Sequence, residues 1–457
     1  MTNIVALRSI LLALLLTGAF VSRVDAAEPV RVPSDGDLAS VREFGAVGDG
    51  QADDTAAVQQ AVNSGKGDIF FPRGVYRFTK PVLVDLNKVG PTSVVGTGTA
   101  RIVMDGSGPA FRFRGTHGGT AAPRTVKPEV WDNQRMPTVE GLEIIGGHQE
   151  AIGIEATETM QMVIERVNIR QCLHAIHLPN RNRNIIISDC HLYENRGVGL
   201  YLDDVNLHQI NVNGCHISYN DQGGIVSRAG QVRNLHVTGC DLEGNMGGED
   251  PTANILIDCT GGNGGTAEVA ITGCTIQHTG GAEDSANIRF IGRDARDRVL
   301  GHLVISNNVF SDVHVNVDIQ DARGVSIVGN TFWMAVQHDL RIEKSSNVVV
   351  GPNLMDRNPG YRDEDKCDGG VLIRDSEDCT VQGLHINGVR RKRAGVVVEN
   401  CSGINIANCT ILDCDNTGLL MEDVTGSRAS GCLLRNRDAQ DWKPMKVIGG
   451  SDNQISR

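Results

Sequence analysis

The chain has 457 residues, of which only 4% are aromatic while 54 are glycine. A globular α/β enzyme fills its core with more large aromatic side chains, so this composition favours short strands, tight turns and a thin, repetitive core. The formal net charge is −12, and no stripe of Lys and Arg with interleaved aromatics is present. These features argue against a nucleic-acid partner.

Residues 1–27 have the pattern of a secretory signal peptide. Arg8 supplies a positive start, residues 10–21 are apolar, and residues 24–27 form a small-residue cleavage site. The apolar stretch is too short to span a bilayer. We therefore predict a secreted or periplasmic protein that is cleaved near Ala26/Ala27 and has no membrane partner afterwards.

Residues 28–80 are expected to form an N-terminal cap and the first strands. The segment AVQQAV has the pattern of a short amphipathic helix, and Asp53 or Asp54 stands where an N-cap is needed. Such a helix covers the apolar open end of a repetitive core. These residues are therefore given a structural role and no chemistry.

A repeat of the form apolar-x-apolar-x-x-(Cys/Asn)-x-apolar follows, with marked positions about 26 residues apart on average. The marked positions are Cys190, Cys215, Cys240, Cys274, Asn308, Asn330, Asn353, Cys409 and Cys432, with weaker copies at Leu142, Val167 and Leu384. Each repeat also holds a second strand with period-two alternation, such as GLYLDD or GVVVEN.

Short strands in repeats of this length bury a core only when identical coils stack on one another. We therefore predict an all-β, single-stranded right-handed parallel β-helix of about 12 coils with three short sheets. The predicted β-helix covers residues 81–445, and residues 446–457 form a C-terminal tail. Leucine-rich repeats, propellers and helical repeats fit the spacing and the period less well.

The twelve cysteines follow the repeat and form no CxxC pair. Stacked side chains of neighbouring coils rarely present the torsion that a disulfide needs. We favour free, buried thiols without a catalytic role over disulfide bridges.

The opening of the predicted cap carries a family resemblance. The features FGAVGDG, DDT, AVQQAV and FPRGVYRF within residues 41–78 resemble the start of the pectate-lyase-like superfamily of exported β-helix proteins, and the repeats over residues 139–440 resemble it diffusely. The resemblance implies a polysaccharide as substrate and a groove along the sheet made by the second strand of each repeat. It does not choose a reaction. The signature motifs of polygalacturonases and mannuronan epimerases are absent or partial.

Aligning these second strands predicts two outward rows of side chains. The central row holds Gly153, His177, Tyr201, Val226, Leu256, Arg289, Asp318 and Arg341, and then turns apolar. The next row holds Glu155, Asp203, Arg228, Asp258, Gln320, Glu343 and Arg374. The charged stretch in the middle coils indicates a site, and the alternative is a ladder of exposed cross-strand ion pairs.

Several reactions fit these residue types. For a lyase acting on an anionic polysaccharide, Arg228, Arg289 and Arg341 would neutralise the substrate carboxylate, and His177 or Tyr201 would exchange protons. An epimerase needs the same equipment.

The carboxylates offer two further uses. Asp203, Asp258 and Asp318 would suit a Ca²⁺ ion that bridges to the substrate. A glycoside hydrolase would draw its acid and its carboxylate from the same three residues and Glu343. A non-catalytic carbohydrate-binding or adhesive solenoid also stays open. We favour the lyase because arginines are spread over the face.

Insertions are expected to wall the binding face. They fall at residues 115–137, 244–253, 260–267, 277–286, 292–301 and 355–369. Trp131 and Tyr361 from these insertions, with Gln320 and Arg374 from the sheet, are the predicted substrate-binding residues. The basic cluster at residues 390–393 is interpreted as a solvated turn.

Overall fold

The structure is a computed structural model that describes residues 38–246, 252–262, 264–278, 283–293, 300–358, 360, 367–439 and 442–456. The predicted signal peptide and Tyr361 lie outside the described residues. No helix among the described residues is long and apolar enough to cross a membrane.

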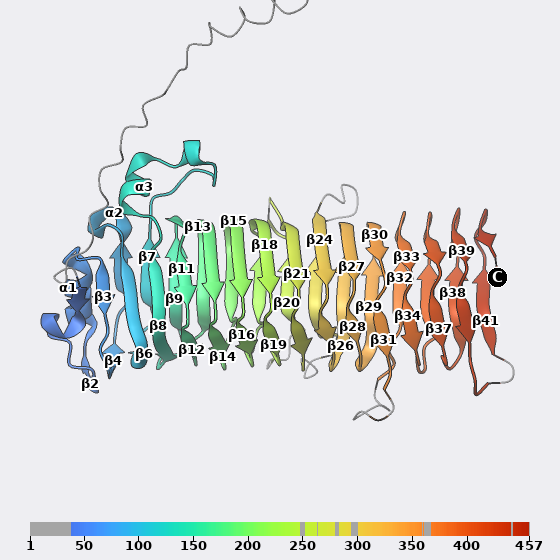
Figure 1. Cartoon of the computed structure of the whole chain (residues 1–457), viewed down its shortest axis with the longest axis horizontal. Helices are drawn as coiled ribbons and strands as arrows, with labels where there is room; N and C mark the ends of the chain where they lie inside the picture. The colour runs from blue at the N-terminus through green and yellow to red at the C-terminus, as the bar shows by residue number, and fades with distance from the viewer. Residues whose placement is uncertain are drawn as a thin grey trace, which may run out of the picture. The chain divides into compact units, whose positions relative to one another are not determined.

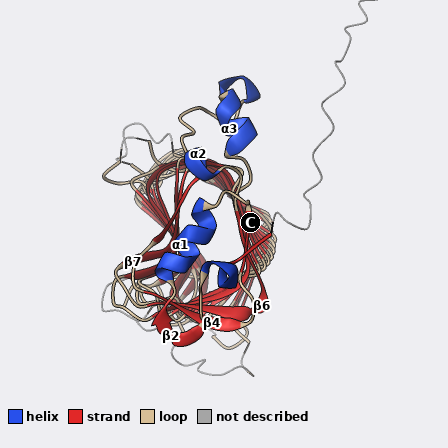
Figure 2. Cartoon of the chain, turned by 90° about the vertical axis from the view of Figure 1, so that its left-hand side faces the viewer, coloured by secondary structure: helices blue, strands red, loops and turns tan. Residues whose placement is uncertain are grey.

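An N-terminal cap closes one end of the molecule (Figure 2). It contains β1 (Leu38–Ser40), the 3-10 helix η1 (Val41–Phe44), β2 (Asp49–Asp53) and α1 (Thr55–Asn63). Helix α1 buries Val58, Ala61 and Val62 against the first coil, because this face is its only apolar stripe. The predicted capping helix is therefore confirmed.

The hydrogen bonds of the two aspartates before α1 differ from the expected helix cap. Asp54 occupies the N-cap position, but its carboxylate accepts hydrogen bonds from the backbone N–H groups of Val47 (2.6 Å) and Gly48 (3.2 Å). Asp53 accepts from the N–H of Thr55 at 3.1 Å. The loop before the helix thus competes successfully for the carboxylate of Asp54.

The described residues form 42 strands, those of the cap included, and these stack in parallel coils along one axis (Figure 1). Each coil contributes one strand to each of three faces, here called sheets one, two and three in chain order. The sheets meet at turns, and long strands run from one sheet into the next. The predicted parallel β-helix is confirmed.

Sheet one carries the second strand of each predicted repeat. It has fourteen strands among the described residues, two more than the twelve marked turns predicted, because the first coils lack the Cys/Asn motif. These strands are β5 (Val82–Asp85), β7 (Gly108–Arg114), β9 (Ala151–Thr157), the first parts of β13 (His174–Ser188) and β15 (Leu200–Asn213), β17 (Ile225–Arg228), β20 (Ala253–Asp258), β23 (Ala286–Ile291), β26 (Val313–Gln320), β29 (Ala335–Glu343), β32 (Val371–Arg374), β35 (Val396–Glu399), β38 (Thr417–Glu422) and β41 (Lys443–Ile448).

Sheet two follows sheet one in each coil. It consists of β1, β3 (Asp68–Phe70), the first parts of β6 (Ser93–Met104) and β8 (Thr138–Gly146), β10 (Thr159–Met160), β11 (Val163–Glu165), the second parts of β13 and β15, β18 (Gln231–Thr238), β21 (Ala267–Thr272), β24 (Gly301–Ser306), β27 (Arg323–Val328), β30 (Ser346–Val350), β33 (Thr380–Gln382), β36 (Asn405–Ala407), β39 (Arg428–Ser430) and β42 (Gln454–Ile455).

Sheet three closes each coil. It consists of β2, β4 (Gly74–Phe78), the second parts of β6 and β8, β12 (Asn168–Arg170), β14 (His191–Tyr193), β16 (His216–Ser218), β19 (Asp241–Glu243), β22 (Thr275–Gln277), β25 (Val309–Phe310), β28 (Thr331–Phe332), β31 (Leu354–Asp356), β34 (His385–Asn387), β37 (Thr410–Leu412) and β40 (Leu433–Arg435). The remaining short helices are α2 (Leu86–Val89), η2 (Pro123–Thr125) and α3 (Pro128–Asn133).

The core is a continuous column of inward aliphatic side chains, as period-two strands require. The marked Cys/Asn positions form a column at the turn between sheets two and three. Asn308 donates to the Oδ1 of Asn330 (3.1 Å), which donates to the Oδ1 of Asn353 (3.0 Å). All twelve cysteines are free, as expected, and eleven of them are buried.

A second polar column, which sequence reasoning missed, lies at the turn between sheets three and one. Each amide Nδ2 donates to the Oδ1 of the next coil, and the column ends on a carboxylate. Its members are Asn195, Asn220, Asn245, Asn254, Asn287, Asn316 and Asp339. Every side chain in it is buried, so each hydrogen bond satisfies a group that water cannot reach.

Candidate functional site

The outward face of sheet one carries two polar regions separated by apolar side chains. The histidine region consists of Arg112, Glu155, His174, His177, Tyr201, Asp203 and Arg228. The arginine region consists of Asp284, Arg289, Asp318, Gln320, His338, Arg341, Glu343 and Arg374. Val226 and Leu256 lie between them in the central row and pack with Tyr201.

The register confirms the outward rows from His177 onward and corrects the coil before it. His177 pairs with Tyr201, and Asp203 pairs with Arg228, as the alignment predicted. In β9, however, it is Glu155 that stands opposite His177, where Gly153 was expected. The strand reaches the outward row two residues later than predicted. Gly153 is a buried residue of β9, where a Cβ would clash with the carbonyl oxygen of Ala175 in the next coil.

His177 joins two carboxylates into one chain of contacts. Its Nδ1 lies 3.1 Å from the Oε2 of Glu155, and its Nε2 lies 3.1 Å from the Oδ2 of Asp203. Glu155 is anchored in turn by the Nε of Arg112 at 2.6 Å. Burial opposes the charged imidazolium, but its hydrogen bonds to Glu155 and Asp203 outweigh that effect and raise the pKa of His177.

The two ends of this chain differ. Burial acts against the ionised form of Glu155, yet the hydrogen bonds from His177 and Arg112 lower its pKa, so it stays a carboxylate. The side chain of Asp203 is 41% exposed, against 15% for Glu155 and 15% for His177. The chain therefore begins at an anchored carboxylate and ends at one that solvent reaches.

Two rings lie beside His177. Tyr201 stacks on it with ring centroids 5.6 Å apart and an interplanar angle of 24°, and His174 lies 5.0 Å from the ring of Tyr201. Burial and the adjacent Asp203 raise the pKa of Tyr201, so it is a neutral phenol. Burial lowers the pKa of His174 to about 4, and its Nδ1 accepts a hydrogen bond from the backbone of Val198 at 3.1 Å.

Arg228 is the exposed cation of the histidine region. It stands in register between Asp203 and Asp258, but its guanidinium makes no ion pair or hydrogen bond with the described residues. Asp258 instead accepts hydrogen bonds from the backbone and hydroxyl of Thr260, at 2.9 and 2.6 Å. Arg228 is therefore able to bind an external anion without breaking an internal contact.

The arginine region is closed by its own ion pairs. Asp318, whose side chain is 0% exposed, contacts the Nε of Arg289 at 2.7 Å and the outer nitrogen of Arg341 at 2.8 Å. Asp284 binds the same two guanidinium groups, at 3.2 and 2.9 Å. Burial opposes the ionised form of Asp318, but its contacts to Arg341 and Arg289 keep its pKa low.

The neighbouring residues of the arginine region are also engaged. Arg374 lies between Glu343 (3.2 Å) and Glu399 (3.0 Å), and Gln320 donates to Asp318 at 2.9 Å. Arg289 and Arg341, which the sequence suggested as groups that neutralise a substrate carboxylate, are thus already ion-paired within the protein. The cause is that Asp318 and the Asp284 loop already supply their anions.

The three aspartates predicted to hold Ca²⁺ do not converge. Asp203 and Asp258 lie in one row with Arg228 between them, whereas Asp318 lies in the central row between two arginines. In the described part of the chain there is no group of three His, Cys, Asp or Glu side chains that could hold a metal ion. The aspartates alone thus do not make a calcium site.

The insertion at residues 115–137 folds against the early coils, as expected. The backbone of His117 bonds to Glu158 at 3.0 Å, and the side chain of Arg181 donates to the carbonyl of Gly119. Trp131 from this insertion packs with the side chains of Val126, Val130 and Met160, none of which belongs to sheet one. The predicted substrate-binding role of Tyr361 concerns a residue outside the described part of the chain.

Sequence reasoning missed two residues of the histidine region, Arg112 and His174, and placed Glu155 in the wrong outward row. The available signal was the pattern AFRFRG in residues 110–115, which repeats the alternation of the later strands. Aligning it with residues 151–157 places Arg112 beside Glu155, as the register shows.

Three family models match parts of the chain. The model described as rhamnogalacturonase A/epimerase, pectate lyase-like, matches residues 38–136, and the model for a right-handed β-helix region matches residues 130–276. The model for periplasmic copper-binding protein (NosD) matches residues 262–439. No curated protein matches the chain.

Solved structures similar to the chain include three from different sources. The A-module of mannuronan C-5 epimerase AlgE4 from Azotobacter vinelandii is 14% identical with a TM-score of 0.39, covering 92% of this chain and 97% of that one. The tailspike protein of E. coli bacteriophage HK620 in complex with a pentasaccharide is 12% identical with a TM-score of 0.47, covering 92% and 80%. PfbA, a surface adhesin of Streptococcus pneumoniae, is 13% identical with a TM-score of 0.41, covering 92% and 91%.

These structural likenesses concern the fold alone. The matched family models and the parallel register along three sheets agree on one architecture. The chain is a right-handed parallel β-helix protein with the pectate lyase-like fold.

Proposed function

We propose that the protein is an exported enzyme that removes a proton from the carbon beside a carboxylate in an anionic polysaccharide, with β-elimination as the outcome. The observation that carries this proposal is the exposed carboxylate of Asp203, which stands at the end of the Arg112–Glu155–His177 chain with Tyr201 and the unpaired Arg228 beside it. These residues lie on sheet one, the sheet that the family resemblance selects.

Each group has a role that its surroundings support. Arg228 binds and neutralises the substrate carboxylate, which makes the neighbouring C–H more acidic. The Asp203 carboxylate accepts that proton, and the electron pair of the C–H bond forms the new C=C bond as the bond to the leaving oxygen breaks. The Tyr201 hydroxyl donates its proton to that oxygen.

His177 is a positioning residue in this proposal. Both of its ring nitrogens are committed to carboxylates, so it has no N–H left for the substrate. Its hydrogen bond to Asp203 orients that carboxylate, in the way that a third group orients the acid–base pair in many enzymes.

A glycoside hydrolase fits less well. That reaction needs one carboxyl group whose raised pKa keeps it protonated beside an ionised one. Glu155 and Asp318 both have lowered pKa values, in each case against the effect of burial, because cations contact them. An epimerase would use the same groups as the lyase, with the proton returned to the opposite face of the sugar.

The test is to incubate the purified protein with polyuronates such as alginate, polygalacturonate and rhamnogalacturonan. A lyase gives ultraviolet absorbance from the unsaturated product, and an epimerase gives deuterium incorporation beside the carboxylate without absorbance. We expect Asp203→Asn to lower kcat by about 10²- to 10⁴-fold. The matched control Asp258→Asn, two coils away in the same row, should keep kcat within about threefold.

Two outcomes would overturn the proposal. One is full activity in Asp203→Asn, which would exclude the Asp203 carboxylate as the group that accepts the proton. The other is the appearance of reducing ends without absorbance or deuterium exchange, which would identify a hydrolase. His177→Gln should change the pH profile of kcat, which a purely structural role would not do. Mass spectrometry of the exported protein tests the cleavage near Ala26/Ala27.

A further inference from the structure

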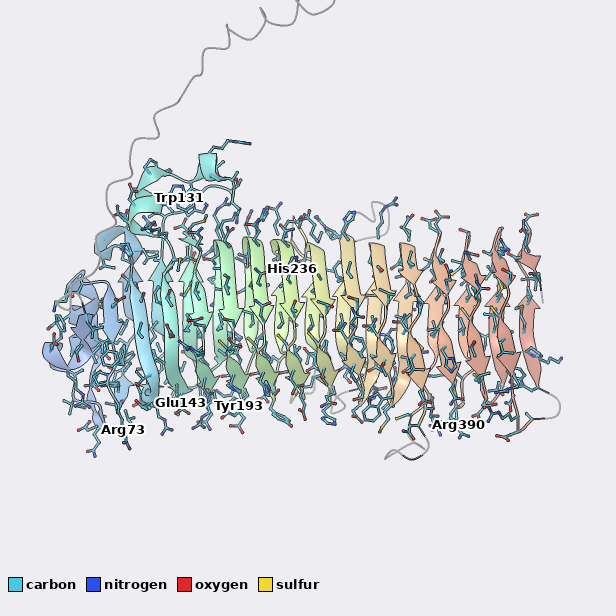
Figure 3. The ribbon with its side chains drawn as sticks, in the orientation of Figure 1. Arg73, Trp131, Glu143, Tyr193, His236 and Arg390 are labelled. Atoms are coloured by element: carbon cyan, nitrogen blue, oxygen red, sulfur yellow. The ribbon has the colours of Figure 1, made fainter. Side chains whose placement is uncertain are left out.

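A long groove runs over the outward face of sheet two, on a different face of the solenoid from the histidine region. His236, labelled in Figure 3, lies on this face. The groove has a volume of about 650 Å³ and crosses the strands β11, β13, β15 and β18. Its lining residues are Met136, Gln161, Val163, Asn184, Ile185, Ile186, Gln209, Asn211, Asn234 and His236.

Backbone conformation explains why this face is hollow. One residue in each of several successive coils has a left-handed φ: Met136 (49°), Gln161 (60°), Asn184 (55°), Gln209 (66°) and Asn234 (55°) line the groove, and Glu268 (60°) and His302 (46°) continue the row beyond it. A left-handed residue bends the chain locally. Because the bends stack in register, sheet two is creased along the solenoid axis, and four successive coils each place one amide side chain in the crease.

The groove has hydrogen-bonding capacity that the protein does not use. The buried Oδ1 of Asn184 has no hydrogen-bond partner. Gln161, Gln209 and Asn211 make no side-chain hydrogen bond with the described residues. Only Asn234 is engaged, through its Nδ2 to Glu268 at 2.9 Å. The solvent-accessible amides of Gln161, Gln209 and Asn211 therefore keep donors and acceptors for an external partner.

The groove also exposes apolar side chains at its N-terminal end. Met136 precedes Gln161 in the amide row and is 58% exposed, and Ile186, which precedes Asn211 and His236 in the neighbouring row, is 40% exposed. The lining contains no Asp, Glu, Lys or Arg. Amides that both donate and accept, beside exposed aliphatic groups and without charge, suit the hydroxyl groups and C–H faces of a neutral sugar.

We propose that this groove is a second carbohydrate-binding surface, which holds an uncharged stretch of a linear polysaccharide along the solenoid axis. One amide per coil, at a spacing of about 4.8 Å, presents a repeating surface to a repeating polymer. The surface differs in charge from the histidine region, where Arg228 selects an anion. A polymer with neutral and anionic stretches, or two polymers in one matrix, would engage both faces.

The test is binding of soluble neutral polysaccharides, namely a mannan, a xylan, a galactan and a dextran, measured by affinity electrophoresis and calorimetry. Ile186→Glu places a charge in the groove at an already exposed position. We expect it to weaken binding of the preferred neutral polymer by at least about tenfold. Val304→Glu is the matched control, since Val304 is 41% exposed and lies in the same outward row of sheet two beyond the groove.

The outcomes separate this proposal from the proposed function. Val304→Glu and Asp203→Asn should both bind the neutral polymer as the unaltered protein does. If Ile186→Glu does not fold, His236→Ala and Asn211→Asp replace it, each with an expected loss of about threefold or more. Binding to none of the polymers, or equal binding by all variants, overturns the proposal. So does a dimer that Ile186→Glu dissociates, because a second copy would then occupy the groove.

Discussion

The histidine and arginine regions use similar residue types on one face of one sheet, yet they differ in what they leave open. In the arginine region, Asp318 and Asp284 face the guanidinium groups of Arg289 and Arg341, and every charge has an internal partner. In the histidine region, a chain of contacts ends at the exposed Asp203, and the guanidinium of Arg228 has no partner within the described ranges of the chain.

The difference shows that charged side chains on a sheet face do not by themselves indicate a site. A closed set of ion pairs holds neighbouring coils in register, and its groups are already neutralised for a substrate. The open set leaves the carboxylate of Asp203 accessible to solvent and the guanidinium of Arg228 without a partner among the described residues. The distinction depends on pairing, and three experiments test it, here in order of decreasing expected effect.

The largest effect is expected on the stability of the arginine region. Asp318→Asn removes the buried carboxylate and leaves two largely buried guanidinium groups with only the partly exposed Asp284 as a shared anion. We expect a loss of about 3–5 kcal/mol in the free energy of unfolding. Urea denaturation followed by circular dichroism measures it. The same change at the partly exposed Asp258 should cost less than about 0.5 kcal/mol, and equal losses in both variants would contradict the closed network.

The second effect is a pair of opposite pH dependences, one from each region. Hydrogen bonds to carboxylates raise the pKa of His177 in the fold above its ordinary value of 6.5. Its stabilising contribution is therefore complete below pH 6.5 and is lost as the pH rises through the folded value. Burial, reinforced by Lys392 and Arg341, lowers the pKa of His338 to about 3. The folded protein therefore keeps His338 neutral while the unfolded chain binds a proton below pH 6.5, so stability declines as the pH falls from 6.5 to about 3.

Two single variants separate these contributions. In His177→Gln the decline in stability above pH 6.5 should become shallower, by at most about 1.4 kcal/mol per pH unit. In His338→Gln the decline between pH 6.5 and about 3 should become shallower instead. Thermal unfolding across this pH range measures both. Identical pH profiles in the two variants would remove the contrast between the regions.

The smallest effect on stability is expected at Arg228. Because its guanidinium has no partner in the described part of the chain, Arg228→Ala should change the free energy of unfolding by less than about 0.5 kcal/mol. The same variant should lower kcat/KM on a polyuronate by about 10- to 100-fold, since a charge-assisted contact to the substrate is lost. A large loss of stability would show that Arg228 is part of a closed network too.

Much of the fold could be predicted because its rules are local. Alternation with period two and one marked turn per coil predicted the stacking and the outward position of His177, Tyr201 and Asp203. The row of Glu155 was missed because alternation does not show which of two outward residues meets the next coil. The pairing of Arg289 with Asp284 could not be predicted, since it depends on how a loop folds back over the sheet.

The asparagine column at the turn between sheets three and one has a consequence for how such a protein gains coils in evolution. Its amides all donate in one direction, from Asn195 toward Asp339, so each coil receives a hydrogen bond from the coil before it and gives one to the next. A duplicated coil that carries asparagine at this corner would lengthen the column without interrupting it. A coil without one would leave a buried donor and a buried acceptor unpaired, at a cost of about 1–3 kcal/mol each. The interior thus favours evolution by whole, amide-bearing coils.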